Sequence, residues 1–512
     1  METEGAVGSI DAEEGKGASA TASDDSGDVI LSGSVQAGKK SLLLALTTNG
    51  VTVHEVQAGE KVKDSSLNLD LPWCEVITAE TSGEGGKSKF SIHFMQYQKD
   101  RKLRHKSLTL TSQDIEPRKW ADAIQTQCQQ VSGRPKNLFV IINPIGGNGK
   151  GSQMYHKSVA PMFKLAGCQT TVVETEKSKH ALEIGETRDF TGFDGIISVG
   201  GDGLYQEILQ GYLVQLQKAA GVNLNDIDEE FVKPKIPFCL IPAGSSNGIV
   251  RYTNDNVRDA ETSALRVIRG ETHPTSIITI HEPGKFIGIS GLAVGVGAMT
   301  DFMKRCDELR WMGKSRYGYG MLRMFVKKKR RFRMQMEYLL DGEPSPIVKT
   351  EGAQGDTESL EIKTGWHQHD IDDKPYVGAT LSTFSVKDMP ECTVIDPFSC
   401  SGDLMVDTGC SNMGIIKYAL MFEGKKINGP IPNIEFIKGA VGVRFKVIQD
   451  PSETDENVSQ ARAREREMEH YLYVDGEVVQ MEGLEVEARL KNDFVSMFGC
   501  IASQLRTPQN AS

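Results

Sequence analysis

The chain has 512 residues, of which 39% are hydrophobic and 25% charged, and its formal net charge is −11. The length suggests about three domains, the composition is that of a globular protein, and the acidic balance argues against nucleic-acid binding. The nine cysteines form no CxxC pair, which favours a reducing compartment over a disulfide scaffold. The acidic N-terminus is unlike a signal peptide and no apolar run is long enough to span a bilayer. We therefore expect a cytoplasmic protein that contacts membranes only peripherally.

Residues 1–28 are rich in Gly, Ser, Asp and Glu, and we expect a disordered acidic tail there. Residues 29–131 then alternate short apolar runs with turn residues, a pattern that predicts antiparallel strands. The segment ends in a predicted helix, Pro117 to Gln130, with Trp120 on its apolar face. Strands closed by one such helix resemble a pleckstrin-homology domain, a β-barrel whose ligand the sequence does not indicate.

Residues 137–271 alternate continuous apolar runs with helical patterns. This alternation predicts a doubly wound α/β domain, in which helices cover both faces of a mostly parallel sheet. Its expected strands are residues 138–142, 170–173, 195–199 and 237–241.

Strands dominate again in residues 272–505, which predict a second, β-rich domain with one long helical region from Met299 to about Arg331. Two polar segments, near 341–376 and 450–467, show no apolar period and are expected to be flexible insertions. The fold class expected for the whole chain is therefore α/β.

Glycine-rich segments follow three of the predicted strands: NPIGGNGKGS from Asn143, GGDG from Gly200 and PAGSSN from Pro242. Ligands of parallel sheets bind beyond the carboxyl ends of strands, and glycines let backbone N–H groups approach phosphate. Taken singly, the first and third segments also fit ordinary turns, whereas glycine on both sides of Asp202 is harder to explain as a helix cap.

Together and in this order, the three segments resemble the diacylglycerol kinase catalytic superfamily, over residues 137–498. Leu204 after the GDG, Thr175-Glu176, and the DGE of residues 475–477 in a strand expected at 471–478 resemble sphingosine and long-chain-base kinases. The stretch LRWMGKSRY, from residue 309, also resembles them and is shared with ceramide kinases.

The resemblance implies a kinase that uses ATP and Mg²⁺, with metal ligands unknown. It implies that Asp202 accepts the proton of the lipid hydroxyl, and that Arg310 and Arg316 contact phosphate through their guanidinium groups. It places Gly200, Gly201 and Gly203 beside the lipid. The residues that it assigns to ATP are Asn143, Pro144, Ile145, Gly146, Gly147, Gly149, Thr175, Glu176, Lys177, Ser178, Lys179, Glu207, Gly244, Ser245, Ser246, Arg310, Arg316, Asp475, Gly476 and Glu477.

The resemblance also implies that Asp301 pairs with the protonated amine of a sphingoid base. Ceramide and diacylglycerol carry no such charge and would leave a buried carboxylate there unpaired. The predicted reaction therefore phosphorylates the primary hydroxyl of sphingosine, sphinganine or phytosphingosine to give the 1-phosphate. A ceramide kinase is the nearest alternative, and a catalytically silent lipid-binding regulator is an alternative of another class. The basic cluster from Lys327 to Arg333 fits either an anionic-lipid contact or a solvated helix end, and a homodimer is left open.

Overall fold

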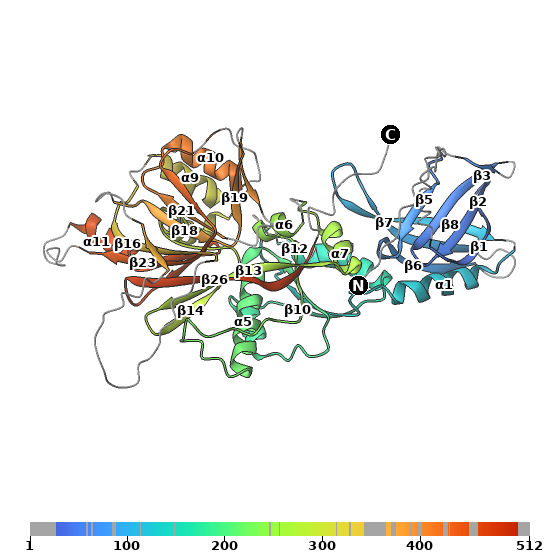
Figure 1. The fold of residues 1–512 in the computed structure, drawn as a ribbon, viewed down its shortest axis with the longest axis horizontal. Coiled ribbons are helices and arrows are strands. Elements are labelled where there is room, and N and C mark those ends of the chain that lie inside the picture. The colour runs from blue at the N-terminus through green and yellow to red at the C-terminus, as the bar shows by residue number, and fades with distance from the viewer. Residues whose placement is uncertain are drawn as a thin grey trace, which may run out of the picture.

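The computed structural model is shown in Figure 1. It describes residues 27–57, 60–62, 65–83, 89–112, 114–147, 149–244, 247–254, 257–313, 315–326, 329–342, 365–369, 375–389, 392–396, 402–422, 429, 431–449 and 459–499. The expected acidic tail, most of the two expected insertions, Ser245 and Ser246 lie outside the described residues. Within the described residues, no helix is both long and apolar enough to cross a membrane.

The N-terminal domain is a set of antiparallel strands closed by one helix, in the order β4-β3-β2-β1-β8-β7-β6 with β5 beside β3. Trp120 of that helix is fully buried and stacks on Phe90, with ring centroids 5.9 Å apart, so the expected apolar face is confirmed. The resemblance to a pleckstrin-homology domain stays a prediction. The elements are β1 (Val29–Ala37), β2 (Lys40–Thr47), β3 (Gly50–Gln57), β4 (Glu60–Lys61), β5 (Leu69–Pro72), η1 (Trp73–Glu75), β6 (Val76–Ser82), β7 (Lys89–Tyr97), β8 (Leu103–Ser112) and α1 (Pro117–Gln129).

The next domain begins with parallel strands, as expected, and their order in the sheet is β10-β9-β11-β12. Successive residues of β9 point to opposite faces of the sheet. Phe139 and Ile141 pack with α4 and α5, whereas Val140 and Ile142 pack with α3 and α7. Helices therefore cover both faces. The elements are β9 (Asn137–Ile142), α2 (Gly151–Met154), η3 (Tyr155–Val159), α3 (Ala160–Leu165), β10 (Gln169–Glu174), α4 (His180–Thr187), β11 (Gly195–Gly200), α5 (Asp202–Ala219), β12 (Phe238–Pro242), α6 (Gly248–Thr253) and α7 (Ala260–Arg269).

The C-terminal half is mostly antiparallel, and its last strand joins it to the preceding α/β domain, which we call the nucleotide half because the sequence predicts a nucleotide site there. Strand β26 pairs with β12 at Phe238 and Met497 and with β13 along most of its length, so one ten-stranded sheet runs through both halves. The elements are β13 (Thr272–Glu282), β14 (Lys285–Ser290), β15 (Ala293–Gly297), α8 (Ala298–Glu308), η4 (Arg310–Met312), α9 (Ser315–Val326), β16 (Arg333–Leu340), β17 (Trp366–Gln368), β18 (Gly378–Ser382), β19 (Ser385–Met389), β20 (Cys392–Asp396), β21 (Asp403–Asp407), α10 (Asn412–Phe422), β22 (Ile434–Lys438), β23 (Ala440–Ile448), α11 (Gln460–Met468), β24 (Tyr471–Val474), β25 (Glu477–Gln480) and β26 (Glu485–Phe498).

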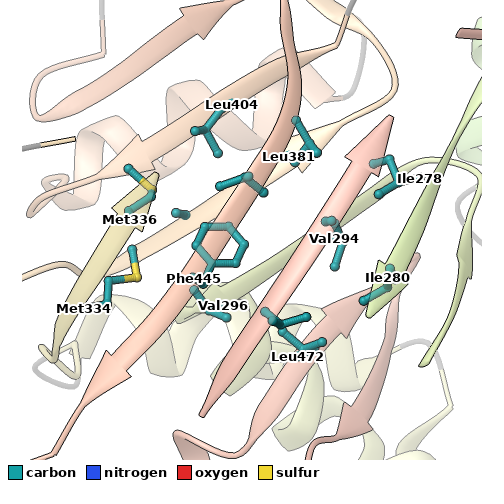
Figure 2. Packing of buried hydrophobic residues seen from close by; sticks show 14 of the residues in the cluster. Ile278, Ile280, Val294, Val296, Met334, Met336, Leu381, Leu404, Phe445 and Leu472 are labelled. Atoms are coloured by element: carbon teal, nitrogen blue, oxygen red, sulfur yellow. The ribbon is translucent and has the colours of Figure 1, made fainter. Parts of the chain in front are cut away.

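A second sheet, of six strands in the order β22-β21-β18-β15-β24-β25, packs on the large one. Figure 2 shows the core between them: Ile280 and Phe445 come from the large sheet, whereas Val296, Leu404 and Leu472 come from the smaller one. Burial of these side chains holds the two sheets together.

The structure adds detail to three sequence predictions in the C-terminal half. The expected helical region is made of α8, η4 and α9, with Gly313 at φ +59° in the turn before α9. Part of the expected insertion at 450–467 is α11, whose N-cap Ser459 accepts the N–H of Arg462. The strand expected at 471–478 is a hairpin, because Asp475 and Gly476 both have positive φ and form its turn.

The N-terminal domain packs on the nucleotide half through a shared core. Ile77, Met95 and Leu103 belong to the same buried cluster as the outer face of β9. In the linker, Arg134 donates hydrogen bonds to the carbonyl of Ile268 and to three carbonyls of the N-terminal domain. The guanidinium of Arg104 on β8 also pairs with Asp259, the N-cap of α7.

Candidate functional site

The three glycine-rich segments meet beyond the carboxyl ends of β9, β11 and β12. A methyl group on Gly244 would lie 2.3 Å from the Cα of Gly201, and one on Gly147 would lie 2.3 Å from the carbonyl oxygen of Ala243. Backbone therefore touches backbone, and no side chain fits between the loops. Such close approach leaves backbone N–H groups available to a phosphate.

The asparagines of the first and third segments shape their own loops. The Oδ1 of Asn143 accepts the N–H groups of Ile145 at 3.2 Å and Gly146 at 2.7 Å. Asn247 has φ +53°, and its side chain accepts the N–H of Gly244 at 3.0 Å and donates to the same residue's carbonyl at 3.1 Å. Because the Asn143 side chain is already bonded internally, we infer that it organises the loop whose backbone would meet the nucleotide.

Asp202 is the first residue of α5 and lies between these loops. Its carboxylate accepts the N–H groups of Gly248 and Ile249 at the start of α6, each at 2.9 Å. The side chain is partly exposed. Two charge-assisted bonds orient the carboxylate toward the cleft edge formed by the third segment.

Gly203, the second residue of α5, is a glycine where the protein itself leaves space. A methyl group there would meet nothing closer than the Oε1 of Glu477, at 4.0 Å. Glycine disfavours a helix relative to alanine, so its presence beside Asp202 fits a ligand that approaches the backbone closely. Glu477 stands across this space, on the first residue of β25.

Glu207, one turn further along α5, faces both Glu477 and the start of α4. Burial raises the pKa of the Glu207 carboxyl, the charge of Glu477 raises it further, and the N–H groups of Ala181, Lys179 and Leu182 oppose the rise. Glu207 thereby links the catalytic helix to the segment that precedes α4.

That preceding segment, residues 175–179, forms an exposed rim beside the first loop. The N–H of Thr175 donates to the carbonyl of Ile142 at 2.8 Å, and that of Glu176 donates to the Nδ1 of His180 at 3.0 Å. Lys177 pairs with Glu183 at 2.6 Å, and Lys179 has φ +59°. The rim is thus held mainly by its own backbone and by α4.

A magnesium ion is implied by the resemblance, and the structure offers it two acids. Within the described residues, no group of three or more His, Cys, Asp or Glu side chains could hold a metal. Mg²⁺ usually takes only one or two carboxylates and is otherwise bound by substrate phosphates and water. The facing carboxylates of Glu207 and Glu477 fit that requirement.

Asp475, expected at the nucleotide, has its carboxylate turned into the protein. It accepts the hydroxyl of Ser290 at 2.6 Å and the N–H groups of Gly291, Leu292 and Ala293 at 2.7, 2.9 and 2.8 Å. Burial raises the pKa of this carboxyl to about 6, against the effect of these bonds. Asp475 therefore fixes the hairpin that carries Glu477.

A second anchor of the same segment was not foreseen from the sequence. Gln206 of α5 donates to the carbonyl of Ile289 and accepts the N–H of Gly291. Together with Asp475, it ties the nucleotide half to the C-terminal half beside the cleft. Nothing in the sequence around Gln206 indicates these contacts, which join residues 83 and 85 positions apart.

Asp301, expected to meet the substrate amine, lies in the first turn of α8 and is paired with Arg330. The guanidinium donates from Nε to one carboxylate oxygen at 3.2 Å and from Nη2 to the other at 3.0 Å. No sequence pattern pointed to this partner, which belongs to the basic cluster at the end of α9.

The expected phosphate arginines are only partly described. Arg316, on α9, donates to the hydroxyl of Tyr317 at 2.8 Å, and the side chain of Arg310 lies outside the described residues. Trp311, between them, is 81% exposed. In the basic cluster, Lys329 donates to the carbonyl of Cys410, so this lysine is turned toward the protein.

Residues 137–280 match the family model of the diacylglycerol kinase catalytic domain. Human ceramide kinase is 34% identical over 207 residues, covering 40% of this chain and 38% of the relative. Ceramide kinase 1 of Caenorhabditis elegans is 36% identical over 212 residues, covering 41% and 38%.

Sphingosine kinase 1 of Arabidopsis thaliana is 29% identical over 260 residues, covering 47% of this chain and 50% of the relative. The matches thus span 38% to 50% of the length of these three relatives. Among solved structures, a diacylglycerol kinase from Bacillus anthracis aligns with 72% of this chain and 98% of its own, at 14% identity and a TM-score of 0.41.

Proposed function

We propose that the protein is a lipid kinase that transfers the γ-phosphate of ATP to the primary hydroxyl of a sphingoid lipid. The observation that carries the proposal is the position of Asp202, where three glycine-rich loops meet in a diacylglycerol kinase catalytic domain. Phosphoryl transfer needs an oriented nucleophile and stabilised charge on the transferred phosphoryl group. In this proposal Asp202 orients the nucleophile, and the glycine-rich loops stabilise the phosphate charge.

Asp202 is the proton acceptor. The N–H groups of Gly248 and Ile249 hold its carboxylate in place, so it can accept the hydroxyl proton without reorienting. The loops at Gly146 and Gly244 bind the ATP phosphates through their backbone N–H groups. Lining of the adenosine by residues 175–179, and phosphate contacts from Arg310 and Arg316, complete the nucleotide site in this proposal.

Magnesium is the cofactor that fits the acids opposite Asp202. When bound, the ion neutralises charge on the phosphates, and Glu207 and Glu477 would hold it. The raised pKa of Glu207, caused by burial and by Glu477, is consistent with a pair of acids that gains from a cation between them.

Two lipid classes compete as substrate. The free sphingoid base was predicted from Asp301, and relatives named sphingosine kinase or long-chain-base kinase support it. Ceramide is favoured by the pairing of Asp301 with Arg330 and by the ceramide kinases, which reach 34% to 36% identity in the human and nematode proteins. Both substrates present the same primary hydroxyl to Asp202.

Membrane contact in this proposal is peripheral and involves the segment of η4 and α9. Trp311 is 81% exposed, Leu322 59% and Val326 79%, although all three are apolar. Apolar side chains gathered on one surface segment are typical of an interface with lipid or protein. Helix α8 packs against α9 and against β25, the strand that begins at Glu477.

The decisive experiment is a transfer assay with labelled ATP that offers sphinganine, ceramide and diacylglycerol to wild type and to Asp202→Asn. The expected result is phosphorylation of a sphingoid lipid by wild type and a loss of about 10²- to 10⁴-fold in the variant. Asp194→Asn is the matched control, because the Asp194 carboxylate also accepts two backbone N–H groups but lies at the opposite end of β9.

No phosphorylation of any lipid by wild type would favour the catalytically silent regulator. Equal loss in Asp202→Asn and Asp194→Asn would assign Asp202 a structural role only. Thermal unfolding of both variants separates a folding defect from a loss of chemistry.

A further inference from the structure

We infer that Leu292 is a specificity-determining residue that makes the cleft transfer phosphate to a lipid hydroxyl and not to water. Leu292 would act on the nucleophile that Asp202 deprotonates, so this inference rests on the proposed function. The observation behind it is a small space that has the Asp202 carboxylate on one side and the Leu292 side chain on the other.

Gly248, the first residue of α6, borders this space. A methyl group on Gly248 would lie 3.7 and 3.8 Å from the two carboxylate oxygens of Asp202 and 3.7 Å from the Cδ1 of Leu292. These are ordinary van der Waals distances, so one carbon atom fits there without a clash. The carboxylate and the leucine methyl group therefore face the same small space, which glycine leaves open.

The backbone of Leu292 is held from two directions. Its N–H donates to the buried carboxylate of Asp475 at 2.9 Å, and its carbonyl accepts the N–H of Thr383 at 2.8 Å and the hydroxyl of Thr383 at 3.2 Å. The side chain is partly buried and packs on the apolar cluster that includes the buried side of α5. Leu292 thus comes from the C-terminal half, yet its side chain has a fixed place beside the carboxylate of Asp202.

Water and a lipid hydroxyl can undergo the same reaction at Asp202. The attacking oxygen bonds to the γ-phosphorus, the bond from that phosphorus to the ADP oxygen breaks, and Asp202 takes the proton. Water would therefore give inorganic phosphate, whereas the lipid gives a lipid phosphate. Water is the smaller nucleophile, and a partly exposed carboxylate does not by itself exclude it. Selectivity for the lipid must come from a neighbouring group.

The side chain of Leu292 can supply this selectivity. The carbon that bears a primary hydroxyl also carries two C–H groups, which gain from packing against an aliphatic side chain. A water molecule at the same place would find no hydrogen-bond partner on the leucine side, and a hydrogen bond left unmade in apolar surroundings is costly. Leu292 therefore favours the hydroxymethyl group, and the bound lipid then keeps water away from the reacting phosphate.

The test follows two products of labelled ATP in one sample, lipid phosphate and inorganic phosphate, with mixed micelles that contain ceramide or sphinganine. In wild type, lipid phosphate should be the main product. Leu292→Ala removes the Cδ1 methyl group and admits water. The ratio of inorganic phosphate to lipid phosphate should then rise about tenfold or more, as expected for missing aliphatic carbons in an apolar contact. Leu292→Met keeps the apolar volume and should bring the ratio back toward that of wild type.

Leu224→Ala is the matched control. Leu224 is also partly buried and packs on the same apolar cluster, but it follows the C-terminal end of α5, whereas Asp202 begins that helix. This truncation should lower stability through the same loss of buried area and leave the product ratio unchanged. If Leu292→Ala lowered both products together and kept the wild-type ratio, Leu292 would be a structural residue only, and the inference would be overturned.

Gly248→Ala approaches the same space from its other side and serves as the second test if Leu292→Ala fails to fold. The added methyl group fits at ordinary contact distances and should hinder a hydroxymethyl group more than the smaller water molecule. The product ratio should rise here through a loss of lipid phosphate, and an unchanged ratio would contradict the inference.

The outcomes separate this inference from the proposed function. A wild type that phosphorylates a lipid, together with variants that keep its product ratio, overturns the role of Leu292 and leaves the lipid kinase in place. A wild type that phosphorylates no lipid overturns the proposed function and this inference with it.

Discussion

The nucleotide half and the C-terminal half hold their polar residues in place by different means. In the nucleotide half, the loops after β9, β11 and β12 touch through glycine backbone, and the asparagine side chains serve their own loops. In the C-terminal half, Asp301 and Asp475 are held by groups far away in the sequence. Loops built from backbone contacts can be recognised in a sequence, whereas the availability of a charged side chain depends on partners that only the fold reveals.

A methyl group inserted between the glycine-rich loops tests whether they need their close backbone contact, and it should have the largest effect. Gly244→Ala would place a carbon 2.3 Å from the Cα of Gly201 and force the loops apart. We expect a loss of about 100-fold in kcat/KM, since small displacements of reacting groups cost that much. Titration with a fluorescent ATP analogue and the transfer assay measure the effect.

Gly318→Ala is the control, because a methyl group there meets nothing within 4 Å and the residue has no positive φ. If Gly244→Ala kept nucleotide affinity and activity close to wild type, the loops could separate without loss of function. That result would contradict the statement that the nucleotide half depends on close backbone contact.

In the C-terminal half, we instead expect a substitution to lower the free energy of unfolding. Asp475→Asn places an amide NH₂ among four donors, so we expect a loss of about 2 kcal/mol at pH 7.5. Asp226→Asn is the exposed control. Urea unfolding gives both values, and a loss equal to that of the control would contradict the anchoring role.

The pKa of Asp475 adds a pH dependence to that effect. Its pKa rises from 3.8 to about 6 on folding, so the folded state binds the proton more tightly. The stabilisation of the folded state by this tighter proton binding is complete below pH 3.8 and is lost as the pH rises through about 6. The deficit of Asp475→Asn should therefore be about 1 kcal/mol larger at pH 5 than at pH 7.5.

The smallest expected effect is that of Gly203→Ala, which tests whether the fold or a bound ligand requires glycine at this position. Gly203→Ala has room in the fold and should stabilise the protein by about 0.5 kcal/mol through helix propensity. The same methyl group stands beside Asp202 in the cleft, so activity should fall. Thermal unfolding and the transfer assay on one preparation test both. Unchanged activity would show that no ligand approaches Gly203.

Much of the fold was predictable from local patterns. Strands β9, β11 and β12 are almost fully buried, apolar and bounded by turn residues, so their positions and their parallel direction followed from the sequence, whereas β10 is mostly exposed. The break between α8 and α9 did not, because α8 ends at Glu308, where no glycine or proline marks the end. The strand β26 was equally hidden, since its pairing with β12 and β13 joins residues more than 200 positions apart.

The candidate site was also only partly predictable from the sequence. The meeting of the three glycine-rich segments was expected, because carboxyl ends of neighbouring parallel strands share an edge. The pairing of Asp301 with Arg330 joins α8 to the segment between α9 and β16 across 29 positions, and nothing local to either residue signals it. The inward turn of Asp475 likewise requires the backbone of residues 290–293 to be in place.

The junction between the N-terminal domain and the nucleotide half has a mechanical consequence. Arg134 bonds carbonyls on both sides, Gly133 packs on Gly270, and three apolar side chains of the N-terminal domain complete the core of the neighbouring domain. Contacts at several separate points would resist rotation of one domain against the other. A partner that binds the N-terminal domain would therefore also set the direction in which the adjoining α/β domain faces (Figure 1).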